Sequence, residues 1–162
     1  MEDGRIKDCQ ITASSAVNND YSPYIARLNT NGYWIPALRF WDQQQYLQVD
    51  FLTKTRVTKI GIQSLKGARK VTAFTLMSSD NGMTWDTVVS SAYFSYSDND
   101  QAESSIPHPH EARFFRFVIE EASDAVKEND LYVAVRLEFY GCYIDSQDTS
   151  GKTSNFCFSK LT

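Results

Sequence analysis

The stretch "QYLQVDFLTKTRVTKIGIQSL", residues 45–65, alternates apolar and polar side chains on both sides of a short polar turn. Before the turn, Leu47, Val49 and Phe51 occupy every second position, and after it Ile60 and Ile62 do the same. Successive side chains of a strand point to opposite faces, so this pattern predicts two half-buried β-strands, at residues 46–51 and 57–65.

The same period of two continues along the chain. Residues 71–89 contain two strand-like runs around Asn81-Gly82, which is a strong hairpin signal. Residues 112–121 and 131–142 also alternate, and one face is expected to point inward: Phe115, Phe117 and Ile119 in the first, and Val133, Val135, Leu137 and Phe139 in the second. Residues 95–105 interrupt the pattern and are expected to form a loop. No segment of helical length carries a 3.6-residue apolar stripe. Many short strands separated by turn signals predict an all-β sandwich or barrel.

Composition limits the function classes. The chain has 162 residues, 42% of them hydrophobic, which fits one globular domain. A net charge of −4 gives no basic field, so nucleic acid is not an expected partner. The sequence has no apolar run long enough for a membrane helix. It also has no glycine-rich phosphate loop and no Gly-x-Ser-x-Gly or His-Glu-x-x-His motif, so no enzyme activity is predicted.

Three cysteines leave two interpretations open. Cys9 opens the first strand-like segment and Cys142 closes the last one, so a bridge between them would tie the two ends together. In the chain-entropy model such a long loop would contribute somewhat under about 5 kcal/mol and would imply an oxidising compartment. Alternatively, all three thiols are free in a cytosolic protein.

Other side chains have structural interpretations. Trp34 and Trp85 are expected in the core, and Asp50 is expected to pair with one of the strand arginines, Arg113, Arg116 or Arg136. The "HPH" motif at residues 108–110 lacks the further ligands of a zinc site and is expected to be a solvated turn, so no metal site is predicted.

Seven ordered segments together resemble one family. They are "CQITASS", "YSPYIARLNTNGYWIP", "QYLQVDF", "VTKIGIQS", "FTLMSSDNGMTW", "EARFFRFVIEE" and "VRLEFYGC". This set resembles the discoidin domain, also called the coagulation factor 5/8 type C domain, from about Cys9 to Cys142. The resemblance implies an eight-stranded antiparallel jelly-roll β-sandwich or barrel with ligand-binding loops protruding at one end. It also implies a Cys9–Cys142 disulfide and therefore an extracellular location.

The resemblance divides the chain into three parts. Residues 9–142 are the expected discoidin domain, residues 1–8 an N-terminal extension, and residues 143–162 a linker or the start of a following module. Cys157 is then left over and is expected to pair with a residue outside this chain.

The loops that the resemblance assigns to ligand binding are residues 17–21, 29–33 and 65–70. A tyrosine face can stack on a sugar, while Asn, Asp and Arg side chains fix its hydroxyls, although Asn and Asp are also ordinary turn residues. Arg39, Phe40 and Trp41 match no family position and form either an exposed partner-binding patch or a cover over the sandwich edge. The candidate ligand-binding residues are Asn18, Asn19, Asp20, Tyr21, Tyr33, Arg39, Phe40, Trp41, Leu65, Lys66, Arg69 and Lys70.

Members of the family bind anionic phospholipid, glycans, collagen or receptor proteins, so the fold does not select the ligand. The sequence looks most similar to the domains of adhesion and receptor proteins. We therefore expect a non-enzymatic recognition module for cell adhesion or receptor–ligand binding, whose ligand is a cell-surface or matrix protein or glycan. Binding to phosphatidylserine membranes is one alternative, although burying Tyr33 and Leu65 would contribute only about 3–5 kcal/mol. A carbohydrate-binding module of a larger enzyme is another, and a calcium ion near Asp20 stays open.

Overall fold

The computed structural model describes residue 1 and residues 3–37, 43–97, 100–123, 132–144 and 156–158. The predicted all-β class is confirmed, since these residues form antiparallel strands and short 3-10 helices. The described part contains seven strands, so the predicted number of eight is not confirmed. The strands are β1 (Ile11–Ala13), β2 (Gln45–Ser64), β3 (Val71–Ser79), β4 (Asp86–Tyr93), β5 (Gln101–Ala122), β6 (Val135–Tyr143) and β7 (Phe156–Phe158); the 3-10 helices are η1 (Asp8–Gln10), η2 (Asn19–Tyr21) and η3 (Pro23–Ile25).

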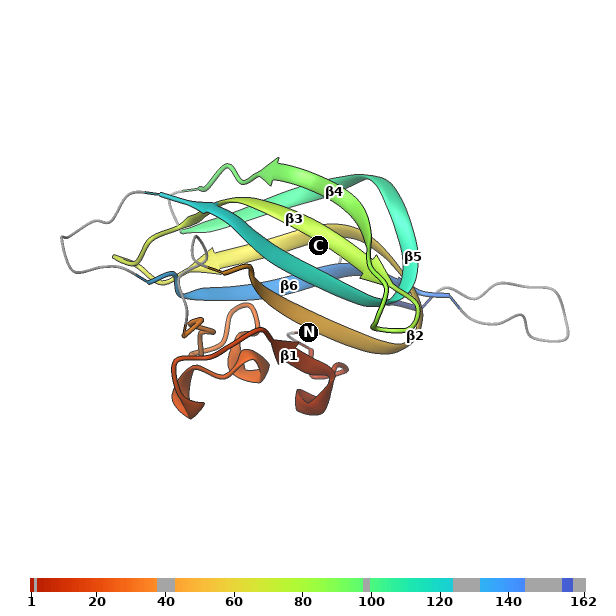
Figure 1. Ribbon diagram of the computed structural model, residues 1–162, viewed down its shortest axis with the longest axis horizontal. Coiled ribbons are helices and arrows are strands. Elements are labelled where there is room, and N and C mark those ends of the chain that lie inside the picture. The colour runs from red at the N-terminus through yellow and green to blue at the C-terminus, as the bar shows by residue number, and fades with distance from the viewer. Residues whose placement is uncertain (2, 38–42, 98–99, 124–131, 145–155, 159–162) are drawn as a thin grey trace, which may run out of the picture.

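A long ribbon of β2 and β5 organises the fold. The two strands predicted at residues 46–51 and 57–65 are the halves of one continuous β2, and both halves pair with β5. The register shifts between Asp50 and Thr55, where Leu52 has a left-handed φ of 62°. In Figure 1 the ribbon bends back on itself at this point. β5 starts at Gln101, so the loop predicted over residues 95–105 is partly wrong.

The bend gives the molecule two layers around one core. The strand order is β4-β3-β5-β2-β6-β7, and β1 pairs with the first half of β2. The ring of Phe51, in the first half of β2, lies 5.9 Å from that of Phe115 in β5 and 6.0 Å from that of Phe139 in β6. The aromatic core therefore joins both layers.

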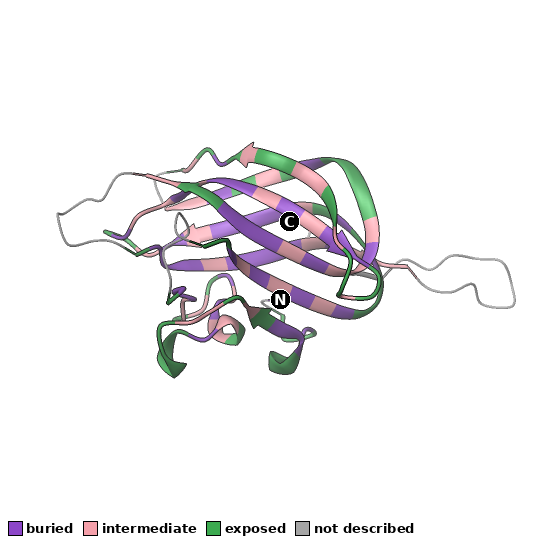
Figure 2. Cartoon of the chain, viewed as in Figure 1, coloured by how far each residue is buried: buried purple, intermediate pink, exposed green. Residues whose placement is uncertain are grey.

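Burial alternates along the strands as predicted, and Figure 2 shows this as alternating purple and pink or green bands. Trp34 is fully buried, as expected, and its indole Nε1 donates to the Ser15 carbonyl at 2.7 Å. The predicted inward-facing residues are all buried: Leu47, Val49, Phe51, Ile60, Ile62, Phe115, Phe117, Ile119, Val133, Val135, Leu137 and Phe139.

Trp85 does not lie in the core, so that prediction is wrong. It is half-buried, and the Arg116 guanidinium carbon lies 3.8 Å from its ring centroid and 3.8 Å from that of Tyr46. Gln48 Oε1 accepts hydrogen bonds from Arg116 Nε and Nη2 at 3.2 and 2.8 Å. Trp85 is therefore held by a cation–π stack on the outer face of the sheet.

The predicted ion pair of Asp50 is confirmed, and its partner is Arg113. Arg113 donates from Nε to Asp50 Oδ1 at 2.8 Å and from Nη2 to Oδ2 at 2.7 Å. Asp50 Oδ1 also accepts the Leu52 backbone N–H at 2.8 Å. Burial alone would raise the pKa of Asp50, but these two donors and the charge of Arg113 outweigh it and hold the pKa below its ordinary value.

His108 and His110 are exposed, as predicted, but they lie within β5 and not in a turn. In the described part of the chain, this first half of β5 pairs with β2, whereas β3 pairs with β5 only from Phe114 onward. Residues 101–112 therefore form an edge. Pro107 and Pro109 lack an N–H, which suits an edge position and discourages pairing with another chain.

The predicted Cys9–Cys142 bridge is wrong in this structure, because Cys9 is an exposed free cysteine whereas Cys142 is disulfide-bonded. Gln10, next to Cys9, donates to the Asp50 carbonyl, while Cys142 lies opposite Arg56 further along β2. The backbone of Cys142 pairs with that of Cys157 in β7, whose side chain lies outside the described residues.

Both predicted flanking segments contact the domain. Met1 and Ile6, within the predicted extension at residues 1–8, belong to the buried core, and β7 pairs with the end of β6. Within the described residues, no helix is long and apolar enough to cross a membrane.

Replacing Gly141 with alanine should strongly destabilise the sandwich. A Cβ at residue 141 would lie 2.0 Å from the Arg56 carbonyl oxygen, so β2 and β6 would have to separate locally. We expect a loss of about 3 kcal/mol or more in the free energy of unfolding, measured by urea titration. Gly67→Ala is the control: a Cβ added at residue 67 would meet no atom within 4 Å, but the residue has a φ of +87°. It should cost only about 1–2 kcal/mol; equal losses would contradict the steric explanation.

Removing the Asp50 carboxylate should abolish a pH-dependent part of the stability. Because its folded pKa is lowered, the contribution is complete above the unfolded pKa and disappears as pH falls through the folded value. We expect Asp50→Asn to be less stable than the wild type at neutral pH and the difference to shrink below about pH 4. Urea titrations across this range measure it. A difference that is constant with pH would rule out the ion pair as its source.

Candidate functional site

The three predicted ligand-binding loops lie together at one end of the sandwich, opposite the bend of β2. Ile35, Ala68 and Ala134 form a small buried cluster there, against which Tyr33 and Leu65 pack. We call this the loop end and define it as residues 17–25, 29–35, 65–70 and 132–135. The strip at residues 132–135 was not predicted as part of the site.

Backbone hydrogen bonds fix these segments to one another. Val17 N donates to the Ile35 carbonyl at 2.9 Å, and Leu65 N donates to the Ala134 carbonyl at 3.0 Å. Residues 69 and 133 form a parallel bridge, and Trp34 pairs with Val135. The loop end is therefore a surface built on β6 and not a set of independent loops.

Tyr33 is half-buried and supports the loop end. The guanidinium of Arg136 lies 3.9 Å from its ring centroid. Arg136 also donates from Nε to the Gly32 carbonyl at 2.9 Å and from Nη1 to Gln63 Oε1 at 2.5 Å. One face of the Tyr33 ring is thus occupied by a cation and is not available for stacking on a ligand.

Two of the three predicted cations in the loop at residues 65–70 also have structural partners. Arg69 Nε donates to the Ser123 carbonyl at 2.6 Å. Lys70 Nζ lies 2.7 Å from Asp100 Oδ1 and 5.0 Å from the Tyr96 ring centroid. Lys66 is exposed. The basic character of this end is therefore weaker than the sequence alone indicated.

Tyr96 braces the loop end from inside. Its hydroxyl donates to the Val71 carbonyl at 2.9 Å and accepts from Ser64 Oγ at 3.1 Å. Burial, partly offset by the Ser64 hydrogen bond, raises its pKa to about 12. The phenol therefore stays neutral and continues to link the end of β2 to the start of β3.

The first loop exposes its polar side chains. Asn18 Oδ1 accepts the Asp20 N–H at 2.9 Å and caps η2, so its acceptor serves the backbone. Asn19 and Asp20 are exposed, and Tyr21 is 37% exposed. These three residues are the best placed of the predicted set to meet a ligand.

Three exposed large hydrophobic residues in the described part of the loop end were not among the predicted site residues. They are Val17, Tyr24 and Tyr132, with exposures of 49, 39 and 45%. The alternation of residues 131–142 contained the signal for Tyr132, because Val133 faces the core and its neighbour must face outward. Val17 and Tyr24 lie in irregular segments, where periodicity gives no orientation.

Arg39, Phe40 and Trp41 lie outside the described residues, so their role stays a prediction. Within the described ranges, no group of three or more His, Cys, Asp or Glu side chains could hold a metal ion. Calcium binding near Asp20 stays a prediction.

The fold and the loop end define an antiparallel β-sandwich with a surface of short loops on a braced scaffold. The sequence profile of the F5/8 type C domain family matches residues 10–136, and the chain belongs to this family. It is 30% identical over 160 residues to the venom prothrombin activator omicarin-C non-catalytic subunit of Oxyuranus microlepidotus, a match that covers 89% of this chain and 10% of that protein. It is 32% identical over 163 residues to coagulation factor V of Mus musculus, covering 89% of this chain and 7% of the relative. The chain thus spans a small part of the curated relatives it matches.

Solved structures share the fold at lower identity. Discoidin II of Dictyostelium discoideum superposes with a TM-score of 0.69 at 14% identity, over 86% of this chain and 57% of that chain. The Clostridium perfringens module CpGH89CBM32-5, in complex with GalNAc-β-1,3-galactose, gives 0.63 at 16% identity, over 85% and 96% of the two chains.

Removing the Arg69 guanidinium should loosen the loop end, whereas removing the neighbouring charge should not. We expect Arg69→Ala to lose about 1–2 kcal/mol of stability, since the half-buried Ser123 carbonyl would lose this donor. Lys66→Ala is the matched control and should stay within about 0.5 kcal/mol. Urea unfolding measures both, and hydrogen exchange of residues 65–71 should rise in Arg69→Ala only. Equal behaviour of the two variants would contradict a bracing role.

Proposed function

We propose that this domain is an extracellular, non-catalytic recognition module that binds a glycan or protein of a cell surface or matrix through its loop end. The observation that carries the proposal is the exposure of Tyr21, Tyr24 and Tyr132 at one end of a braced scaffold. Asn19 and Asp20 are exposed in the same segment as Tyr21. Exposed aromatic side chains on rigid supports supply contact area at a low entropic cost.

The chemistry of the loop end suits neutral polar ligands. Tyrosine rings can stack on the apolar face of a sugar, and the amide and carboxylate of Asn19 and Asp20 can bind its hydroxyls. The shared fold with a module solved in complex with GalNAc-β-1,3-galactose supports a glycan as the ligand. The relationship to coagulation factors and a venom subunit supports the extracellular placement and leaves protein ligands within the proposal.

A module of a larger enzyme is a variant of the same proposal. One structural neighbour is a chitosan-binding module derived from a chitosanase/glucanase of Paenibacillus. The recognition chemistry would then be unchanged, and only the attached domain would differ.

Binding to anionic lipid is the second candidate. Val17 is 49% exposed beside the tyrosines, which favours contact with an apolar phase. Against it, Arg69 and Lys70 are engaged in bonds to Ser123 and Asp100. Stable membrane attachment usually needs a basic patch in addition to a small apolar anchor, and Lys66 alone supplies little charge.

Alanine at Tyr21 or Tyr132 should weaken ligand binding without unfolding the domain, because both rings are partly solvent-exposed. The probes are a glycan array containing GalNAc-β-1,3-galactose, chitosan oligosaccharides and pectin, each with and without calcium, and immobilised collagen. We expect about a tenfold or larger loss of affinity for each bound probe.

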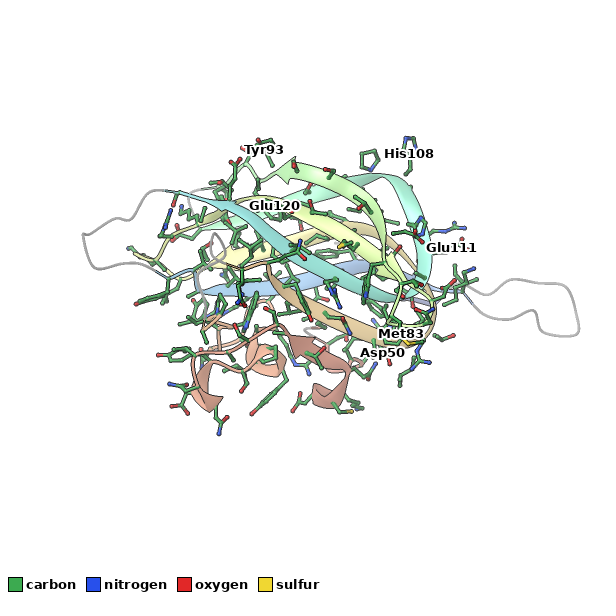
Figure 3. The ribbon with its side chains drawn as sticks, in the orientation of Figure 1. Asp50, Met83, Tyr93, His108, Glu111 and Glu120 are labelled. Carbon is green, nitrogen blue, oxygen red and sulfur yellow. The ribbon has the colours of Figure 1, made fainter. Side chains whose placement is uncertain are left out.

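Tyr93→Ala is the matched control, since this residue is 65% exposed on the edge strand β4, across the sandwich from the N-terminal 3-10 helices (Figure 3). It should bind as the wild type does. Sedimentation with phosphatidylserine vesicles and with neutral vesicles tests the second candidate. Selective pelleting with phosphatidylserine, together with no binding to glycans or collagen, would overturn the proposed order.

A further inference from the structure

In the turn between β3 and β4, the side-chain carbonyl of Asn81 accepts several hydrogen bonds. Asn81 Oδ1 accepts the backbone N–H groups of Met83 and Thr84 at 2.8 and 2.9 Å. It also accepts the hydroxyls of Ser79 and Thr84 at 3.1 and 3.2 Å. Asn81 is itself exposed, so water reaches the turn.

Ser79 links this carbonyl to the next backbone nitrogen. Its hydroxyl oxygen accepts the Gly82 N–H at 2.9 Å while its own proton points to Asn81 Oδ1 at 3.1 Å. Ser79 is 3% exposed, so its hydroxyl is held in this position by the surrounding fold. One hydroxyl thus touches both a nucleophilic nitrogen and an electrophilic amide.

We propose that Asn81-Gly82 is a self-modification site at which the turn promotes cyclisation of Asn81. The Gly82 nitrogen attacks Asn81 Cγ and forms a C–N bond, its proton passes to Ser79 Oγ, and the Ser79 proton passes to Oδ1. The tetrahedral intermediate then expels ammonia, which takes up that hydroxyl proton, and leaves a cyclic imide. Water opens the imide at either carbonyl to give aspartate or isoaspartate, with no oxidant or reductant required.

The physical basis is the same as in enzyme active sites. Fixed donors stabilise the negative charge that develops on Oδ1, and a positioned hydroxyl relays the proton. Gly82 has no side chain to shield its nitrogen and adopts a left-handed φ of +73°. The turn is therefore arranged around the oxygen and nitrogen that the reaction changes.

The chain contains its own control. Asn31-Gly32 is the same dipeptide, and Asn31 is also exposed. In the part of the chain that the structure describes, the Asn31 amide has no comparable set of donors, and the Gly32 carbonyl is bound by Arg136 Nε at 2.9 Å. The intrinsic reactivity of the two sites is matched, so a difference between them reports on the surrounding structure.

Peptide mapping by mass spectrometry after incubation at neutral pH and physiological temperature tests the proposal. In the native domain we expect Asn81 to convert roughly tenfold faster than Asn31. In concentrated guanidinium the two rates should become equal, because the donors are no longer held in place. A native rate at Asn81 equal to or below that at Asn31 would overturn the proposal.

Ser79→Ala separates catalysis by the turn from simple protection. If the Ser79 hydroxyl relays the proton, the variant converts Asn81 more slowly; if the turn only restrains the chain, loosening it makes conversion faster. A faster or unchanged rate therefore contradicts the proposal. Thr84→Val, which removes one exposed hydroxyl donor, gives the same comparison if Ser79→Ala fails to fold. Asn81→Asp identifies the aspartate product in the maps.

Discussion

The fold depends on the bend of the β2–β5 ribbon, and the bend depends on Asp50. One carboxylate oxygen of Asp50 accepts the N–H of Leu52, and both oxygens bind Arg113 across the ribbon. Leu52 is a bulky residue with a φ of 62°, a conformation that is normally unfavourable for L-residues. The charged hydrogen bonds hold the chain in this conformation, so the two halves of each strand can face each other across the aromatic core.

At the loop end, several charged side chains stabilise the loops through bonds within the domain. Arg69 and Lys70 carry charges that the sequence analysis assigned to ligands, yet each has a structural partner. Arg136 likewise bonds to the Gly32 carbonyl. A cation that is already hydrogen-bonded would have to break that contact before binding a ligand. The exposed tyrosines have no such contact to break, which is why the proposed recognition rests on their rings and on the exposed Asn19 and Asp20.

The sequence pattern correctly predicted the features of the fold that depend on neighbouring residues. The inward positions of β2, β5 and β6 follow from alternation, and the Asn81-Gly82 hairpin follows from turn chemistry. Periodicity could not predict whether Trp85 faces the core or the solvent, because that residue lies between strands and its partner Arg116 is distant in sequence. The Cys9–Cys142 pairing failed for a related reason: order along the chain does not fix which residues meet, and the register places Cys142 beside Cys157 of β7 while Cys9 is free.

The roles of Tyr33 and Arg136 show why a site of this kind resists prediction. The two residues are separated by most of the chain, and the pairing of residue 34 with Val135 brings them together. Before folding, Tyr33 and Tyr21 are equivalent candidates, since both are tyrosines beside turn residues. After folding, a guanidinium covers one ring while the other is 37% exposed. The difference between a supporting and a binding tyrosine therefore arises from β6, which carries few of the residues that suggested a site.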